Sequence, residues 1–169
     1  MDGVPALDLP LAISTLGEEL AACETNPNQA VFQVAVEGTT RDLHPILRDE
    51  VYRIAAEALR NAFKHAHAHR IEVEIRYDER QFRLRVRDNG KGIRTELSND
   101  GEPPGHYGLR GMRERAKLLG GKLTVWSELD SGTEVELRLP ATNAYLTADG
   151  GKRSRSAGRF PGKGMEQKP

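Results

Sequence analysis

Apolar and polar residues alternate along the chain with two different periods, and each period predicts one kind of element. Apolar residues at every third or fourth position indicate an amphipathic helix, whereas strict alternation indicates a half-buried strand. Helices are predicted over residues 11–23, 45–68 and 109–119, and strands over 30–37, 71–77, 82–87, 122–126 and 133–139. Because four of the strands form two hairpins and the helices are set apart from them, the pattern predicts an α+β fold, a two-layer sandwich.

The strands over 71–77 and 82–87 carry their apolar residues on one face only. The opposite face of the first strand carries glutamates, and that of the second carries arginines. One face of the sheet is therefore expected to pack against the helices while the other faces water, with Glu–Arg pairs across the neighbouring strands.

Both ends of the chain lack this periodicity. Residues 1–10 are irregular, and the tail over 145–169 is rich in Gly, Ser, Lys and Arg. We therefore expect one domain over residues 11–144 between disordered ends. A long segment over 88–107, rich in Gly, Pro, Asn and Asp, interrupts the domain and is typical of a lid or binding loop.

Composition narrows the class of protein. The chain has 169 residues, 25 of them basic and 25 acidic, and this balance argues against a protein that coats DNA or a membrane surface. Cys23 is the only cysteine, which excludes a disulfide within the chain and a cysteine-built zinc site. We expect a cytoplasmic location, because no apolar run of about 18 residues and no secretory signal pattern occur.

One predicted helix carries polar residues suited to nucleotide chemistry. Glu57, Asn61 and Lys64 lie on one helical face, so that a carboxylate, an amide and a cation follow one another. An amide oxygen can ligate Mg²⁺, a lysine can meet phosphate charge, and a carboxylate can polarise a nucleophile. Taken alone, the pattern also fits a solvated helix face.

Two glycine-rich segments add to this picture. In the first, over residues 87–92, Asp88 stands at a strand end, where its carboxylate can accept a hydrogen bond from the amino group of adenine and would repel the carbonyl oxygen of guanine. The glycines after it allow the backbone to approach a base closely. The second segment, over 105–111, leads into a helix N-terminus, where free N–H groups bind anions. Alone, the two segments also fit a turn and a flexible loop before a capped helix.

Together, in this order, these segments resemble the ATPase domain shared by histidine kinases, gyrase, mismatch-repair ATPases and a heat-shock chaperone, known as the Bergerat fold. Residues 57–66 look like its N box, 88–92 like its G1 box, 105–111 like its G2 box, and 131–133 match its final Gly-Thr. The run that begins at Gly105 is similar to the nitrate-sensor and desaturase-sensor branch of histidine kinases. The resemblance implies a mixed, mostly antiparallel sheet with helices on one face and an ATP lid.

The resemblance also implies how ATP and Mg²⁺ would bind, between the N-box helix and the lid. Asp88 would select adenine with support from Gly92 and Thr133, Asn61 would hold Mg²⁺, and Glu57 would act as a base or orient the nucleophile. The other residues implied to contact the nucleotide are Arg60, Lys64, His65, Gly90, Ile93, His106, Tyr107, Gly108, Leu109, Arg110, Gly111 and Met112.

The implied function is that of the catalytic domain of a two-component sensor histidine kinase, which transfers the γ-phosphoryl group of ATP to a histidine. His44 starts the helix that bears the N box and cannot present itself to that helix's own nucleotide, so the acceptor is expected on a separate dimerisation domain. The further expected partner is a response regulator, with no nucleic acid. The intact protein is expected to be a homodimer associated with a membrane.

Two alternatives remain open. One is a serine kinase or ATP-dependent switch of the same fold, similar to an anti-sigma factor. The other is a metal site at His65, His67 and His69, although no carboxylate or cysteine completes such a ligand set.

Overall fold

The structure, a computed structural model, describes residues 8–24, 29–93 and 108–147. Its elements are α1 (Leu9–Cys23), β1 (Val31–Glu37), α2 (Pro45–His65), β2 (Arg70–Tyr77), β3 (Gln81–Asp88), α3 (Gly108–Leu118), β4 (Lys122–Glu128), β5 (Gly132–Pro140) and α4 (Ala141–Ala144). Every helix and strand predicted from the periodicity is present, and the short α4 is added to them.

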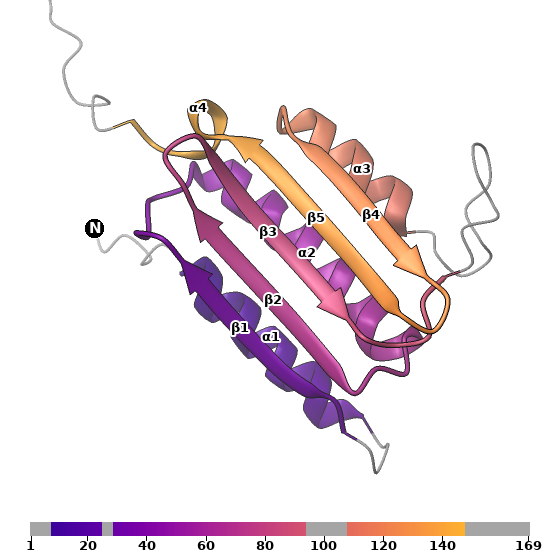
Figure 1. Ribbon diagram of the computed structural model, residues 1–169. Coiled ribbons are helices and arrows are strands. Elements are labelled where there is room, and N and C mark those ends of the chain that lie inside the picture. The colour runs from indigo at the N-terminus through magenta and orange to yellow at the C-terminus, as the bar shows by residue number, and fades with distance from the viewer. Residues whose placement is uncertain (1–7, 25–28, 94–107, 148–169) are drawn as a thin grey trace, which may run out of the picture.

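The five strands form one sheet in the order β1-β2-β3-β5-β4 (Figure 1). β1 pairs with β2 in parallel, and the other neighbours are antiparallel. The parallel pair is connected through α2, because parallel neighbours need a crossover whereas antiparallel ones need only a turn. Figure 1 shows α1, α2 and α3 on the same face of the sheet, which confirms the predicted two-layer α+β sandwich.

The core lies between this face of the sheet and α2. Ala55, Ala58 and Ala62 are buried along α2, and their small side chains let the helix lie close to the strands. Val73 and Phe82 are buried on the facing strands and belong to the same apolar cluster. Exposed polar residues of α2, such as Arg60 and Lys64, thereby face away from the sheet.

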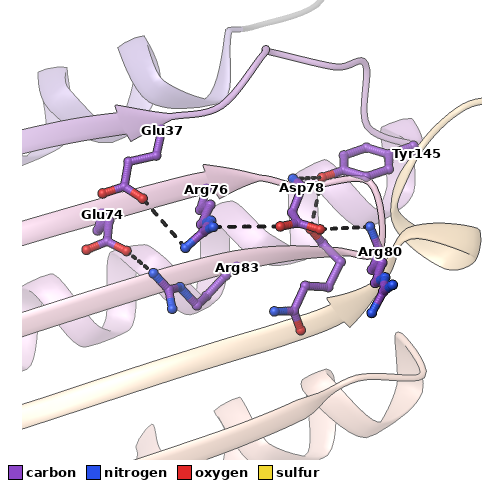
Figure 2. Close-up of polar contacts among 8 residues, drawn as sticks. Glu37, Glu74, Arg76, Asp78, Arg80, Arg83 and Tyr145 are labelled. Carbon is purple, nitrogen blue, oxygen red and sulfur yellow. Dashed lines mark hydrogen bonds and ion pairs between the residues drawn. The ribbon is translucent and has the colours of Figure 1, made fainter.

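The opposite face of the sheet carries the predicted charge pairs. Glu74 lies opposite Arg85 across β2 and β3 and forms an ion pair with it. Glu74 also forms an ion pair with Arg83 (Figure 2). Burial by itself raises the pKa of Glu74, but the two guanidinium groups outweigh it and lower the pKa below its ordinary value. The prediction of Glu–Arg pairs across these strands is confirmed.

Two helix ends differ from the prediction. α1 begins at Leu9, which is buried in the core, and Pro10 stands in the first turn, where its missing N–H is not needed. α2 ends at His65 instead of residue 68, because His67 has a φ of 49°, outside the range of a right-handed helix.

Tyr145 lies within the predicted disordered tail but is only 5% exposed. Its hydroxyl accepts a hydrogen bond from the backbone N–H of Asp78 at 3.1 Å and donates one to the carbonyl of Gln81 at 3.2 Å (Figure 2). The guanidinium carbon of Arg41 lies 3.9 Å from the centre of the tyrosine ring. These contacts fix the segment after β5 to the β2–β3 hairpin, so the domain extends past residue 144. The rest of the expected disordered ends, residues 1–7 and 148–169, lies outside the described residues.

Tyr145→Phe is expected to lower the free energy of unfolding by about 1–2 kcal/mol, because the N–H of Asp78 and the carbonyl of Gln81 both lose their hydroxyl partner. Urea unfolding of the chain measures the change. Tyr52→Phe on α2 is the matched control and is expected to change stability by less than about 0.5 kcal/mol. An equal effect of the two substitutions would show that the hydroxyl of Tyr145 does not clamp the hairpin.

Candidate functional site

A cavity of about 190 Å³ lies between the second half of α2, the turn after β3, the start of β5 and the first residues of α3. Predicted nucleotide-binding residues line it from all four elements: Asn61, His65, Asp88, Gly92, Ile93, Leu109 and Thr133. The segments that resemble the N, G1 and G2 boxes and the final Gly-Thr are far apart in sequence, and the fold brings residues from each of them to one cavity.

Asp88 is the buried carboxylate of this cavity. It is the last residue of β3, is 6% exposed, and accepts a hydrogen bond from the backbone N–H of Gly90 at 2.9 Å. Burial raises its pKa above the ordinary value, although the backbone N–H groups of Gly90 and Thr133 act in the opposite direction. A carboxylate offers about four lone-pair positions. Asp88 therefore retains capacity to accept a further hydrogen bond from a ligand.

The turn after Asp88 packs closely against neighbouring backbone at Ala66 and Glu128, and its glycines make this close packing possible. Gly92 has a φ of +67°, and a Cβ there would lie 2.0 Å from the carbonyl oxygen of Glu128. A Cβ on Gly90 would lie 2.1 Å from the carbonyl oxygen of Ala66, just after α2. That same oxygen accepts a hydrogen bond from the N–H of Lys91 at 2.8 Å. The turn is thus joined directly to the end of α2.

A buried hydroxyl group holds the other side of the turn. The Oγ of Ser127, on β4, accepts a hydrogen bond from the N–H of Ile93 at 2.7 Å. It lies 2.8 Å from the Oγ1 of Thr133 and 3.1 Å from the carbonyl oxygen of Gly132. Thr133 therefore supports the turn through Ser127 as well as lining the cavity.

The predicted N-box residues take different positions along α2. Asn61 and His65 line the cavity. Arg60 and Lys64 are exposed and lie outside its lining. Glu57 is partly exposed, and its carboxylate lies beside Gly108, the first residue of α3.

Only one of the predicted residues on α3 lines the cavity, namely Leu109. Arg110 is exposed and forms an ion pair with Glu114. Gly111 faces open space, and Met112 is buried in the apolar core, away from the cavity lining. His106 and Tyr107 lie outside the described residues.

Several lining residues were missed by the sequence interpretation. They are Ala58, Ala62, Ala66, Val86, Lys91 and Val135. Apart from Ala66, which directly follows α2, the alanines and valines occupy apolar positions of α2, β3 and β5, so their periodicity signals burial and not contact with a ligand. No motif in the sequence pointed to Ser127, because it lies on β4, which is brought near the site only by its pairing with β5.

The competing metal-site hypothesis gains no support from the arrangement of the histidines. Within residues 8–24, 29–93 and 108–147, no group of three or more His, Cys, Asp and Glu side chains is arranged to hold a metal ion. In the same part of the chain, no helix has the length and apolar character needed to cross a lipid bilayer.

Comparison with known proteins identifies relatives of the cavity-bearing part. The profile of the family described as histidine kinase-, DNA gyrase B-, and HSP90-like ATPase matches residues 47–143. Sensor histidine kinase LiaS of Bacillus subtilis is 38% identical over 94 residues, which is 56% of this chain and 25% of that protein. Sensor protein VraS of Staphylococcus saprophyticus is 33% identical over 103 residues, 61% of this chain and 28% of that protein.

Solved structures agree on the fold. The histidine kinase domain of the blue-light activated histidine kinase from Erythrobacter litoralis EL346 superposes with a TM-score of 0.60 at 24% identity, covering 83% of this chain and 66% of that one. The chain spans about a quarter of the length of the relatives LiaS and VraS. Since the family profile covers more than half of the chain, the chain belongs to the histidine kinase-, DNA gyrase B-, and HSP90-like ATPase family and carries its ATP-binding domain.

Proposed function

We propose that the cavity binds ATP with Mg²⁺ and that this domain transfers the γ-phosphoryl group to a histidine of a separate dimerisation domain. The observation that supports this most is a buried carboxylate, Asp88, which lines the same cavity as an amide on α2, Asn61. Between them the cavity walls are apolar, formed by Ala62, Val86 and Val135. Such walls suit the faces of a purine, and the carboxylate suits its amino group.

The residues present fit the absent nucleotide and metal. Asp88 has acceptor capacity left for the amino group of adenine, and the same carboxylate repels the carbonyl oxygen at this position of guanine. Asn61 offers the neutral oxygen that Mg²⁺ accepts as a ligand. When bound, Mg²⁺ supplies the positive charge that offsets the phosphates.

The protein's own groups would then orient the reacting atoms. Glu57 lies on α2 one turn before Asn61, where its carboxylate can hold the incoming imidazole or accept its proton. His65, Arg60 and Lys64 follow on the same helix and would attract the ribose and phosphates. Phosphoryl transfer depends mainly on positioning and charge, which suits a site built of an amide, glycines, two carboxylates and one metal ion.

The same proposal names the partners. The relatives LiaS and VraS are described as a sensor histidine kinase and a sensor protein, and this chain matches about a quarter of each. We infer a response regulator as the final phosphoryl acceptor, and a homodimeric, membrane-associated protein with this domain on the cytoplasmic side.

The chain alone is expected to bind Mg²⁺–ATP without labelling itself from [γ-³²P]ATP, whereas addition of its dimerisation domain is expected to produce labelled dimerisation domain. Calorimetry measures the binding, and gel autoradiography measures the transfer. Phosphohistidine is acid-labile and phosphoserine is not, so an acid wash separates a histidine kinase from a serine kinase of the anti-sigma type. An acid-stable label would contradict the proposal, as would strong self-labelling of this chain on histidine.

A further inference from the structure

Gly108, the first residue of α3, lies directly against Glu57 of α2. A Cβ on Gly108 would lie 2.2 Å from the Oε1 of Glu57 and 2.7 Å from both its Cγ and its Cδ. All three of the atoms nearest to that Cβ belong to Glu57. No carbon atom fits at 2.2 Å from an oxygen without displacement, so a side chain at residue 108 and the present position of the carboxylate exclude each other.

Backbone conformation does not account for this glycine. Gly92 and Gly132 have positive φ angles of 67° and 95°, whereas Gly108 is helical and its φ lies outside that region. Gly111, one turn further along the same helix, has no atom within 4 Å of its built Cβ. Alanine is the better helix former at a helical position. What distinguishes Gly108 is therefore the space taken by Glu57.

A second polar contact also joins α3 to α2. Besides the contact in which Glu57 fills the space left by Gly108, an Arg115 guanidinium nitrogen lies 2.8 Å from an Oε2 of Glu50. The two contacts are seven residues apart on each helix, and the helices run in opposite directions between them. The first contact adjoins the cavity, because Leu109 lines it.

We propose that Gly108 is a positioning residue for the N-box carboxylate: its missing side chain fixes where Glu57 sits and how closely the N-terminus of α3 approaches α2. This inference rests on the proposed function, in which the cavity binds ATP, and on the expectation that the free N–H groups at the N-terminus of α3 bind phosphates. A methyl group at residue 108 displaces either the carboxylate or the helix end, and both displacements change the phosphate side of the cavity while leaving Asp88 untouched.

A double-mutant cycle tests the contact through nucleotide binding. Gly108→Ala is expected to weaken Mg²⁺–ATP binding about tenfold and ADP binding less, whereas the same change in the Glu57→Ala background is expected to alter the affinity of that variant by less than about threefold. Removal of Glu57 thus removes the penalty of the methyl group. An equal weakening by Gly108→Ala in both backgrounds would overturn the proposal, because the glycine would then be required for a reason other than Glu57.

Thermal stability tests the same contact without any nucleotide. Gly108→Ala is expected to lower the melting temperature when Glu57 is present and to raise it in the Glu57→Ala background, where only the better helix propensity remains. Gly111→Ala is the matched control and is expected to raise the melting temperature equally in both backgrounds. An equal shift by Gly108→Ala in both backgrounds would overturn this inference alone. A different result would separate the two proposals. If the unmodified chain failed to bind ATP while the melting temperatures of the variants followed the expected pattern, the proposed function would be overturned and the contact between Gly108 and Glu57 would still be supported.

Discussion

Asp88→Asn is expected to reduce the affinity for ATP by about 100-fold or more, the largest effect we anticipate for any conservative substitution in the cavity. The carboxylate is buried, lines the cavity, and already accepts the N–H of Gly90. An asparagine amide keeps one acceptor oxygen for that bond and turns N–H donors toward the amino group of adenine. Calorimetric titration with Mg²⁺–ATP measures the loss.

The same substitution is expected to leave the fold intact. Because burial raises the pKa of Asp88, its protonated form contributes stability that is present below the ordinary aspartate pKa and is lost as the pH rises through the raised value. Ionised Asp88 therefore costs stability at neutral pH, and Asp88→Asn is expected to unfold at an equal or higher urea concentration there. Asp49→Asn, on the exposed side of α2, is the matched control. Unchanged ATP affinity in a folded Asp88→Asn variant would remove Asp88 from adenine recognition.

Asn61→Ala is expected to abolish the dependence of nucleotide affinity on Mg²⁺. Asn61 lines the cavity on α2 across from Asp88, and its loss removes the neutral oxygen assigned to the metal. Interactions with a charged partner are worth about 1.5–3 kcal/mol, so binding in the presence of Mg²⁺ is expected to weaken by at least about tenfold, while binding in excess EDTA changes little.

The control for this measurement is Asn143→Ala on α4, whose amide donates to the carbonyl of Leu119 outside the cavity. If Mg²⁺ still strengthened ATP binding to Asn61→Ala as much as to the unmodified chain, the metal would be held by other groups.

Most of the fold could be predicted from the periodicity of apolar residues. The strands could be predicted from alternating apolar and polar residues, because one face of the sheet is exposed to water. The same alternation predicted Glu–Arg ion pairs on that face, which Glu74 forms with Arg83 and Arg85. Helix ends were less accessible, since α2 stops where His67 takes a positive φ, a local feature that apolar spacing does not reveal. Tyr145 was missed because a single aromatic residue in a polar tail has no period, and only the distant hairpin explains its burial.

Residues of the candidate site could be predicted from the sequence where a short motif coincides with the end of a helix or strand. Asp88, Asn61 and Thr133 were named from short motifs, and the structure brings them to one cavity; their roles in binding remain predictions. Met112 shows the limit of motif reasoning, because its helical position on the apolar side of α3 outweighs its place in the motif and it is buried in the core. The role of Ser127 could not be predicted from the sequence, since it depends on the register that places Ser127 opposite Thr133 across β4 and β5.

The N–H of Lys91 donates to the carbonyl of Ala66, and the side chain of Asn89 accepts the N–H groups of His69 and Arg70. The turn after β3 is thus hydrogen-bonded to the segment that joins α2 to β2. In the proposed function, Gly92 and Ile93 of this turn belong to the wall of the ATP cavity, so much of the cost of ordering that wall is met when the chain folds.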